Sequence, residues 1–116
     1  MVFVGRSKTF SLENEGQYDT IGAFWDEMSL AHGMENLQGL GYRWQEGKIW
    51  YAIGLKEGEI AQANVSLTLP EDGWCVVEGR TEDLKQIYDE IYQAGPLRYE
   101  IETFTEDGMC RIAYYR

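Results

Sequence analysis

The chain has 116 residues, of which 44% are hydrophobic, and this length suits one domain with its own core. Its 20 acidic and 10 basic side chains give a formal net charge of -10, which argues against direct binding to nucleic acid or to anionic membranes. The two cysteines, Cys75 and Cys110, lie far apart without a CxxC motif, so we expect reduced thiols in a cytoplasmic protein.

The first elements along the chain are a strand and a helix. Residues 2–10, VFVGRSKTF, have the composition of a strand. In DTIGAFWDEMSLAHG, apolar side chains recur at helical spacing, Asp19 or Thr20 caps the start, and Gly33 ends the segment. We therefore expect the first helix to lie between these caps.

Three further strands are predicted between the first helix and Pro70. GLGYRW and IWYAIGLK are joined by a short turn at Glu46 and Gly47, which is typical of a hairpin. The segment AQANVSLTLP then alternates apolar and polar residues up to Pro70. We interpret this last segment, at about 60–70, as a strand that bridges two halves of the chain.

The second half repeats the pattern of the first. WCVVEGR predicts a strand, and TEDLKQIYDEIYQAGP predicts a helix that Thr81 caps and Gly95 and Pro96 end. LRYEIETF and MCRIAYYR predict two strands around the turn TEDG.

The order strand, helix, strand, strand thus occurs twice, over about 1–56 and 73–116. We expect a single α+β domain built from a duplicated unit. Both helices have an apolar stripe that needs cover, which an antiparallel sheet provides when it carries both helices on one face. The opposite face is then free, and a curved sheet would form a ligand cleft there.

Four segments, spread in order over nearly the whole chain, carry a resemblance to a known family. They are IGAFW, YAIGL, LTLPEDGWCVVEGRTEDLKQIYDEIY, and YEIETF followed by GMCRIAYYR. The chain resembles the GyrI-like small-molecule-binding domains, which occur as stand-alone DNA gyrase inhibitor proteins and as effector-binding domains of AraC-type and MerR-type regulators. The resemblance implies a duplicated strand–helix–strand–strand fold that binds aromatic, amphipathic and often cationic compounds. The chain is shorter than many members at its start and between Lys56 and Val65.

Glu102 is the candidate ligand-facing acid. Residues 101–104, IETF, match the family pattern of an apolar residue, Glu, any residue and an aromatic, and the resemblance implies that this Glu faces the ligand. From the residues alone the alternative is a solvated strand face, because Glu is rarely buried without a partner. In the cleft reading, strand alternation points Glu102 and Phe104 away from the helices, and Glu100 stays at the rim or in solvent.

Aromatic residues make up 14% of the chain and supply candidate pocket walls. Besides Glu102, the candidate ligand-binding residues are Trp25, Trp44, Trp50, Tyr51, Trp74 and Phe104. Trp50 shares a strand face with Ala52 and Gly54, whose small size would leave room for a ligand. Trp25 lies on the apolar stripe of the first helix, where a core position competes with a pocket position. For Tyr51, a core position and a pocket position are equally compatible with the sequence.

The sequence predicts no metal site and no cofactor. His32, the only histidine, lies near the end of the first helix, where it can interact with the terminal carbonyl groups. No cluster of carboxylates has metal-ligand spacing, and no glycine-rich phosphate loop joins a strand to a helix. Tyr114 and Tyr115 lie on opposite faces of the last strand, so we expect one of them, not yet distinguished, to face the cleft.

Three functions compete. The first is a stand-alone module that binds aromatic or amphipathic cations as a drug or metabolite sensor or a sequestering protein, and it accounts for the aromatics, the acidity and Glu102 together. The second, implied by the resemblance, is a hydrolase of reactive cyclopropane-bearing aromatic compounds in which Glu102 activates water, although the sequence indicates no second catalytic group. The third is a protein inhibitor of the DNA gyrase type. A regulator or another protein is a candidate partner for any of these.

Overall fold

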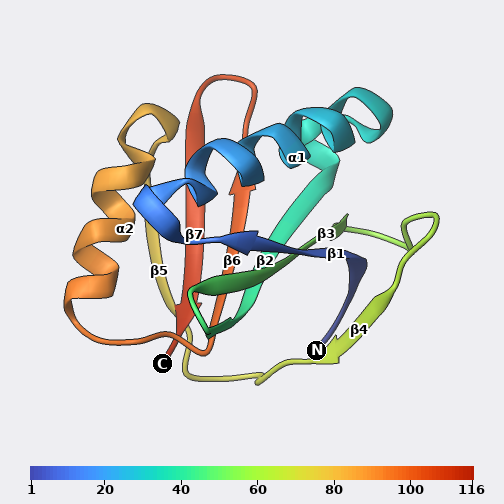
Figure 1. The fold of residues 1–116 in the computed structure, drawn as a ribbon. Coiled ribbons are helices and arrows are strands. Elements are labelled where there is room, and N and C mark those ends of the chain that lie inside the picture. The colour runs from blue at the N-terminus through green and yellow to red at the C-terminus, as the bar shows by residue number, and fades with distance from the viewer.

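The computed structural model describes all 116 residues and shows one seven-stranded antiparallel sheet with two α-helices on one of its faces (Figure 1). The strands are β1 (Val2–Ser11), β2 (Leu37–Gln45), β3 (Lys48–Leu55), β4 (Val65–Thr68), β5 (Cys75–Arg80), β6 (Tyr99–Phe104) and β7 (Met109–Tyr115), and the helices are α1 (Gln17–His32) and α2 (Leu84–Gln93). The predicted α+β class is confirmed.

The sheet has the strand order β4-β1-β3-β2-β6-β7-β5. Apart from β4, the two halves of the sheet have the same strand order when read outward from the central β2–β6 pair. One half runs β2, β3, β1 and the other runs β6, β7, β5, so each goes from its second strand through its third to its first. The order strand, helix, strand, strand occurs on both sides of β4, as expected. The origin of this arrangement by duplication stays a prediction.

The strands form where the sequence alternates or is rich in β-branched and aromatic residues. The β2–β3 hairpin turns at Glu46 and Gly47, whose φ angles of 55° and 72° are those of a type I′ turn and confirm the predicted position. The bridging segment forms a shorter strand than the predicted 60–70, because only Val65–Thr68 pair with β1.

Both helices begin differently from the prediction. α1 starts at Gln17, two residues before Asp19, and no side chain caps it. Thr81 opens a short 3₁₀ turn before α2 instead of capping that helix. Gly33 ends α1 as predicted, since its φ of 81° suits glycine and its N–H donates to the Ser29 carbonyl.

Side chains fill both faces of the sheet. On the helix side, α1 contributes Phe24, Trp25 and Met28 to a core with Tyr51 and Ile53 of β3. On the opposite side, Phe3 of β1 and Leu69, just after β4, form a second core with side chains of the other strands. These are Leu40, Ala52, Ile101 and Ala113. Neither helix combines the length and the apolar composition that crossing a membrane requires.

Candidate functional site: an acidic pocket beneath the helices

A pocket of about 430 Å³ lies between the two helices and the sheet. Its lining includes residues of α1, α2, β2, β3 and β6. The pocket therefore opens on the face that carries the helices, and the prediction of a cleft on the opposite face is wrong.

The positions of the helices explain where the pocket forms. α1 packs on β1 and β3, and α2 packs on β5, so each helix covers one flank of the sheet (Figure 1). The central strands β2 and β6 form the floor between them. On β2 this floor includes Gly39 and Gly41, where a Cβ atom would collide with Tyr51 and Glu100 respectively. Two glycines thus leave space for side chains that reach over the sheet from neighbouring strands.

The helix-free face has no room for the predicted cleft. Gly54, which was expected to leave open volume, lies against the backbone of β1, where an added Cβ would overlap the Val4 carbonyl oxygen. Ala52 is fully buried in the core of that face. The small residues on β3 therefore accommodate close chain packing and not a ligand.

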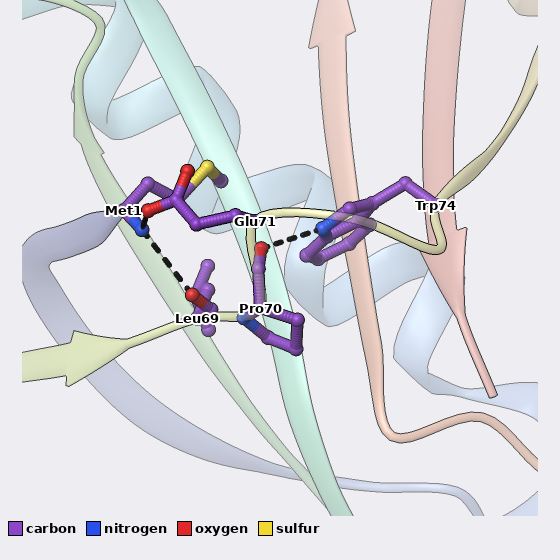
Figure 2. Close-up of polar contacts among 5 residues, drawn as sticks. All are labelled: Met1, Leu69, Pro70, Glu71 and Trp74. Atoms are coloured by element: carbon purple, nitrogen blue, oxygen red, sulfur yellow. Dashed lines mark hydrogen bonds and ion pairs between the residues drawn. The ribbon is translucent and has the colours of Figure 1, made fainter.

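Two of the predicted pocket residues, Trp50 and Trp74, lie on the helix-free face and do not line the pocket. The Arg43 guanidinium sits over the Trp50 ring, 5.2 Å from its centroid. Figure 2 shows Trp74, whose Nε1–H donates to the Pro70 carbonyl oxygen at 2.8 Å. The Trp74 ring also packs against Tyr99 and Tyr115. Both tryptophans have structural partners, so their assignment to the pocket is wrong.

A β-bulge in β2 turns Trp44 into the pocket. Gly41 pairs with Tyr51 and Arg43 pairs with Trp50, so two steps on β2 match one on β3, with Tyr42 as the extra residue. Strict alternation would place Trp44 on the same face as Leu40, in the opposite core. The bulge reverses that alternation, and Trp44 lines the pocket as predicted.

The other predicted residues also converge on the pocket, which is lined by Trp25, Tyr51, Glu102 and Phe104. Trp25 is both buried and pocket-lining, so its two competing roles are compatible. Trp25 stacks edge-on against Phe104 at 4.9 Å between ring centroids. Tyr114 lies on the helix side with α2 and Tyr115 on the other side, but neither lines the pocket.

Glu102 is buried at the centre of a hydrogen-bond network. Its Oε1 accepts a hydrogen bond from the Tyr51 hydroxyl, and its Oε2 accepts one of 2.5 Å from the Tyr88 hydroxyl. The Trp25 Nε1–H donates to the Tyr51 oxygen at 2.7 Å. Burial raises the pKa of Glu102, while these donors oppose the rise because they favour the ionised form. The reading of Glu102 as a solvated residue is excluded, since only 4% of it is exposed.

Glu100 is a second buried carboxyl group, and its predicted place at the rim or in solvent is wrong. It is only 4% exposed, and its Oε2 accepts a hydrogen bond of 2.8 Å from the Tyr92 hydroxyl. Burial first, and then the charge of Glu102, raise its pKa to about 8. Residues 100 and 102 are two positions apart on one strand, so both side chains point to the same face, which is the helix side.

The hydroxyl groups around the two carboxylates act only as donors to them. Burial and the neighbouring glutamates raise the pKa of Tyr51, Tyr88 and Tyr92 well above the usual range. These tyrosines therefore stay neutral and keep their protons directed at Glu100 and Glu102. The carboxyl oxygens of Glu100 and Glu102 are therefore the acceptors of this network.

The pocket nevertheless lacks a counter-charge for the carboxylates and a donor for one further acceptor. No lysine, arginine or histidine lines the pocket, so neither carboxylate has a cationic partner there. Gln17, at the start of α1, has a buried side-chain oxygen, Oε1, that no donor reaches. A buried acceptor without a donor costs about 1–3 kcal/mol, which a ligand donor would recover.

Sequence reasoning missed several lining residues, chiefly Tyr18, Tyr88, Tyr92 and Glu100. The signal for the α2 pair was present, because Tyr88 and Tyr92 are four residues apart and share one helix face. An apolar stripe at helical spacing, such as the one on α2, favours a core position over a pocket position. The acidic pair of β6 was also visible as i, i+2 glutamates, but their common face was assigned to the wrong side of the sheet.

Comparisons with protein-family models, curated proteins and solved structures find no match to this chain. The structure contains no group of three or more His, Cys, Asp or Glu side chains that could hold a metal ion. The arguments for function therefore come from the pocket itself and from the resemblance described above.

Proposed function

We propose that the chain is a stand-alone small-molecule-binding module whose pocket takes aromatic or amphipathic cations. One observation carries the proposal: two buried carboxyl groups face an aromatic pocket of about 430 Å³ in which no basic side chain lies. The volume falls within the range of small-molecule sites in proteins. The function would be that of a drug or metabolite sensor or a sequestering protein.

Electrostatics favour a cation over a neutral ligand. Burial removes the solvation that stabilises an ionised carboxylate, and a bound cation restores a favourable partner in its place. The rings of Trp25, Trp44 and Tyr51 can add cation–π attraction of about 0.5–2 kcal/mol for each well-placed ring. The formal charge of -10 further raises the local concentration of cations around the protein.

The resemblance to GyrI-like domains supports the same proposal. It puts Glu102 at the position that faces the ligand in that family, and Glu102 is a pocket residue here. We also place the protein in the cytoplasm, because Cys75 and Cys110 are both free thiols, as is usual in a reducing compartment.

Glu100 favours hydrolysis as a second candidate function. The sequence offered Glu102 alone, whereas the structure brings a second buried carboxyl group beside it. In such a pair, one group can hold a proton as a general acid while the other, ionised, activates water. Incubation with a cyclopropane-bearing aromatic compound, followed by mass spectrometry, tests this function: a hydrolase forms a water-addition product that Glu102→Gln abolishes.

Binding is tested with two probes that differ only in charge. Protonated 2-naphthylmethylamine and neutral 2-naphthalenemethanol have the same ring system, and calorimetric titration measures the affinity of each. We expect wild type to prefer the cation and Glu102→Gln to lose that preference. Glu90→Gln, which removes an acidic group from the exposed face of α2, is the matched control and should bind like wild type.

A second variant tests the location of the site. Gly22 lines the pocket from α1, and a Cβ atom there would meet nothing within 4 Å. Gly22→Leu should therefore fill the pocket without disturbing the fold, and both probes should lose affinity. Equal affinity of wild type for the amine and the alcohol, or unchanged binding in Gly22→Leu, would contradict the proposal.

A further inference from the structure

The two carboxyl groups of the pocket are separate acceptors and not one shared site. Glu100 and Glu102 alternate on β6, so their backbone positions are about 7 Å apart at the usual rise of an extended strand. Each lies opposite a glycine of β2, because Gly39 pairs with Glu102 and Gly41 pairs with Glu100. The space above Gly41 holds the Glu100 carboxyl group, and the space above Gly39 holds the Tyr51 hydroxyl, which donates to Glu102.

The hydrogen bonds around the two groups are also separate. Tyr51 and Tyr88 donate to Glu102, and Tyr92 donates to Glu100, while no side chain bridges the two. Both oxygens of Glu102 thus have protein donors. By contrast, the hydrogen bond that Glu100 accepts from Tyr92 goes to Oε2, and Oε1, which is not a fully buried unpaired atom, is free to accept a donor from the pocket. This free oxygen of a pocket-lining carboxyl group points to a ligand group at Glu100 as well as at Glu102.

One positive charge cannot compensate both groups. Two ionised carboxylates in one poorly solvated pocket repel each other, so without a second cation one of them keeps a proton. The titratable groups that face the pair are Tyr18 from α1, Tyr51 from β3, Tyr88 and Tyr92 from α2 and the Cys110 thiol from β7, and none of them is basic. A second cationic group on the ligand would take the place of that proton, because the protein supplies no basic group there.

Building on the proposed function, we propose that the preferred ligand is a dication, with two protonated nitrogen groups about 7 Å apart across an aromatic unit, one for each glutamate. The aromatic unit would lie among the rings of Trp25, Trp44 and Phe104. Glu100 then determines specificity, since it separates ligands with two cationic groups from ligands with one.

Ligand binding should also change the protonation of the carboxyl pair. At neutral pH the empty pair retains one proton, held mainly at Glu100, whose pKa burial and Glu102 raise to about 8. A ligand with two cationic groups ionises both carboxyl groups and so releases that proton to the solvent. A ligand with one cationic group pairs with the carboxylate that is already ionised and releases much less.

The test compares p-xylylenediamine, which carries two ammonium groups at pH 7, with 4-methylbenzylamine, which carries one on the same ring. Calorimetric titration in phosphate and in Tris, two buffers with different ionisation enthalpies, measures affinity and proton release together. We expect the diamine to bind wild type at least about tenfold more tightly, a difference of about 1.4 kcal/mol, and to release close to one proton. Glu100→Gln should remove both the preference and the proton release, while Glu90→Gln should keep both.

The outcomes separate this inference from the proposed function. If 2-naphthylmethylamine binds but the diamine binds no better than 4-methylbenzylamine, or binds without proton release, the dication inference is overturned and the proposed function stands. If no amine binds, both fail. Because Glu100→Gln keeps an acceptor for the Tyr92 hydroxyl, a circular dichroism spectrum like that of wild type confirms that any loss of binding is not a loss of folding.

Discussion

The free energy of unfolding should fall as the pH rises from 5 to 7, and Glu100→Gln should remove much of this fall. The pKa of Glu100 is 4.5 in the unfolded chain and rises to about 8 in the folded protein. Below pH 4.5 the group is protonated in both states and affects stability little. Above that pH the unfolded chain releases the proton while the folded protein keeps it, so the unfolded state gains free energy of ionisation that the folded state lacks.

The size of the effect follows from the same linkage. Each pH unit between the two pKa values changes the free energy of unfolding by about 1.4 kcal/mol for one proton. From pH 5 to pH 7, Glu100 thus lowers the stability of wild type by about 2.7 kcal/mol, which is a large share of the roughly 5–15 kcal/mol of a typical domain. The pKa of Glu102 is raised as well, so its contribution has the same sign.

Urea unfolding followed by far-ultraviolet circular dichroism at pH 5, 6, 7 and 8 measures this dependence. Glutamine has the shape of glutamate without its ionisation, and its carbonyl oxygen can still accept the Tyr92 hydroxyl. Glu100→Gln should therefore gain stability relative to wild type as the pH rises, while the exposed control Glu90→Gln should follow wild type. A wild-type stability that is constant or rising over this range, or a Glu100→Gln variant with the same pH profile, would refute the burial argument.

Three further substitutions test the architecture of the pocket. Gly39→Ala adds a methyl group that would overlap Tyr51, so we expect the free energy of unfolding in urea to fall by about 1–3 kcal/mol. Gly22→Ala has open space around it and should raise that free energy by about 0.5–1 kcal/mol. Tyr88→Phe deletes one donor to a buried carboxylate and should cost about 1–3 kcal/mol at pH 7, with a smaller loss at pH 4 where that group is protonated. Trp44→Ala should weaken binding of 2-naphthylmethylamine, while Trp50→Ala should leave its affinity unchanged; equal effects of the two would argue against the bulge-directed pocket.

Much of the fold could be predicted because it depends on local patterns. The apolar spacing in α2 and the turn at Glu46 and Gly47 are properties of short segments, so the helix forms within the predicted segment and the hairpin turns at the predicted residues. Helix starts were less predictable. α1 begins at Gln17 without any capping side chain, so the capping residues that the sequence offered were not used.

The candidate site was predictable in part. Strand alternation correctly put Glu100, Glu102 and Phe104 on one face, because successive side chains of a strand point in opposite directions. Trp44 lines the pocket, but only because the bulge at Tyr42 turns it there, and a one-residue irregularity leaves no clear mark in a hydrophobic pattern. Trp50 and Trp74 were wrong because aromatic content says nothing about which partners a ring will meet.

The α+β class, the order of the strands and helices, the hairpin turn and the shared face of the two glutamates could all be predicted from the residues alone. All of these follow from the backbone conformation that nearby residues prefer. The side of the sheet that holds the pocket could not be predicted in this way, because it depends on long-range packing. That choice depends on where α1 and α2 settle relative to the glycine-lined centre of β2, and on β1 and the segment after β4 filling the opposite face. The same packing buries Glu100 beside Glu102 without a basic partner. Such contacts join segments that are far apart in the chain, so local sequence patterns do not predict them.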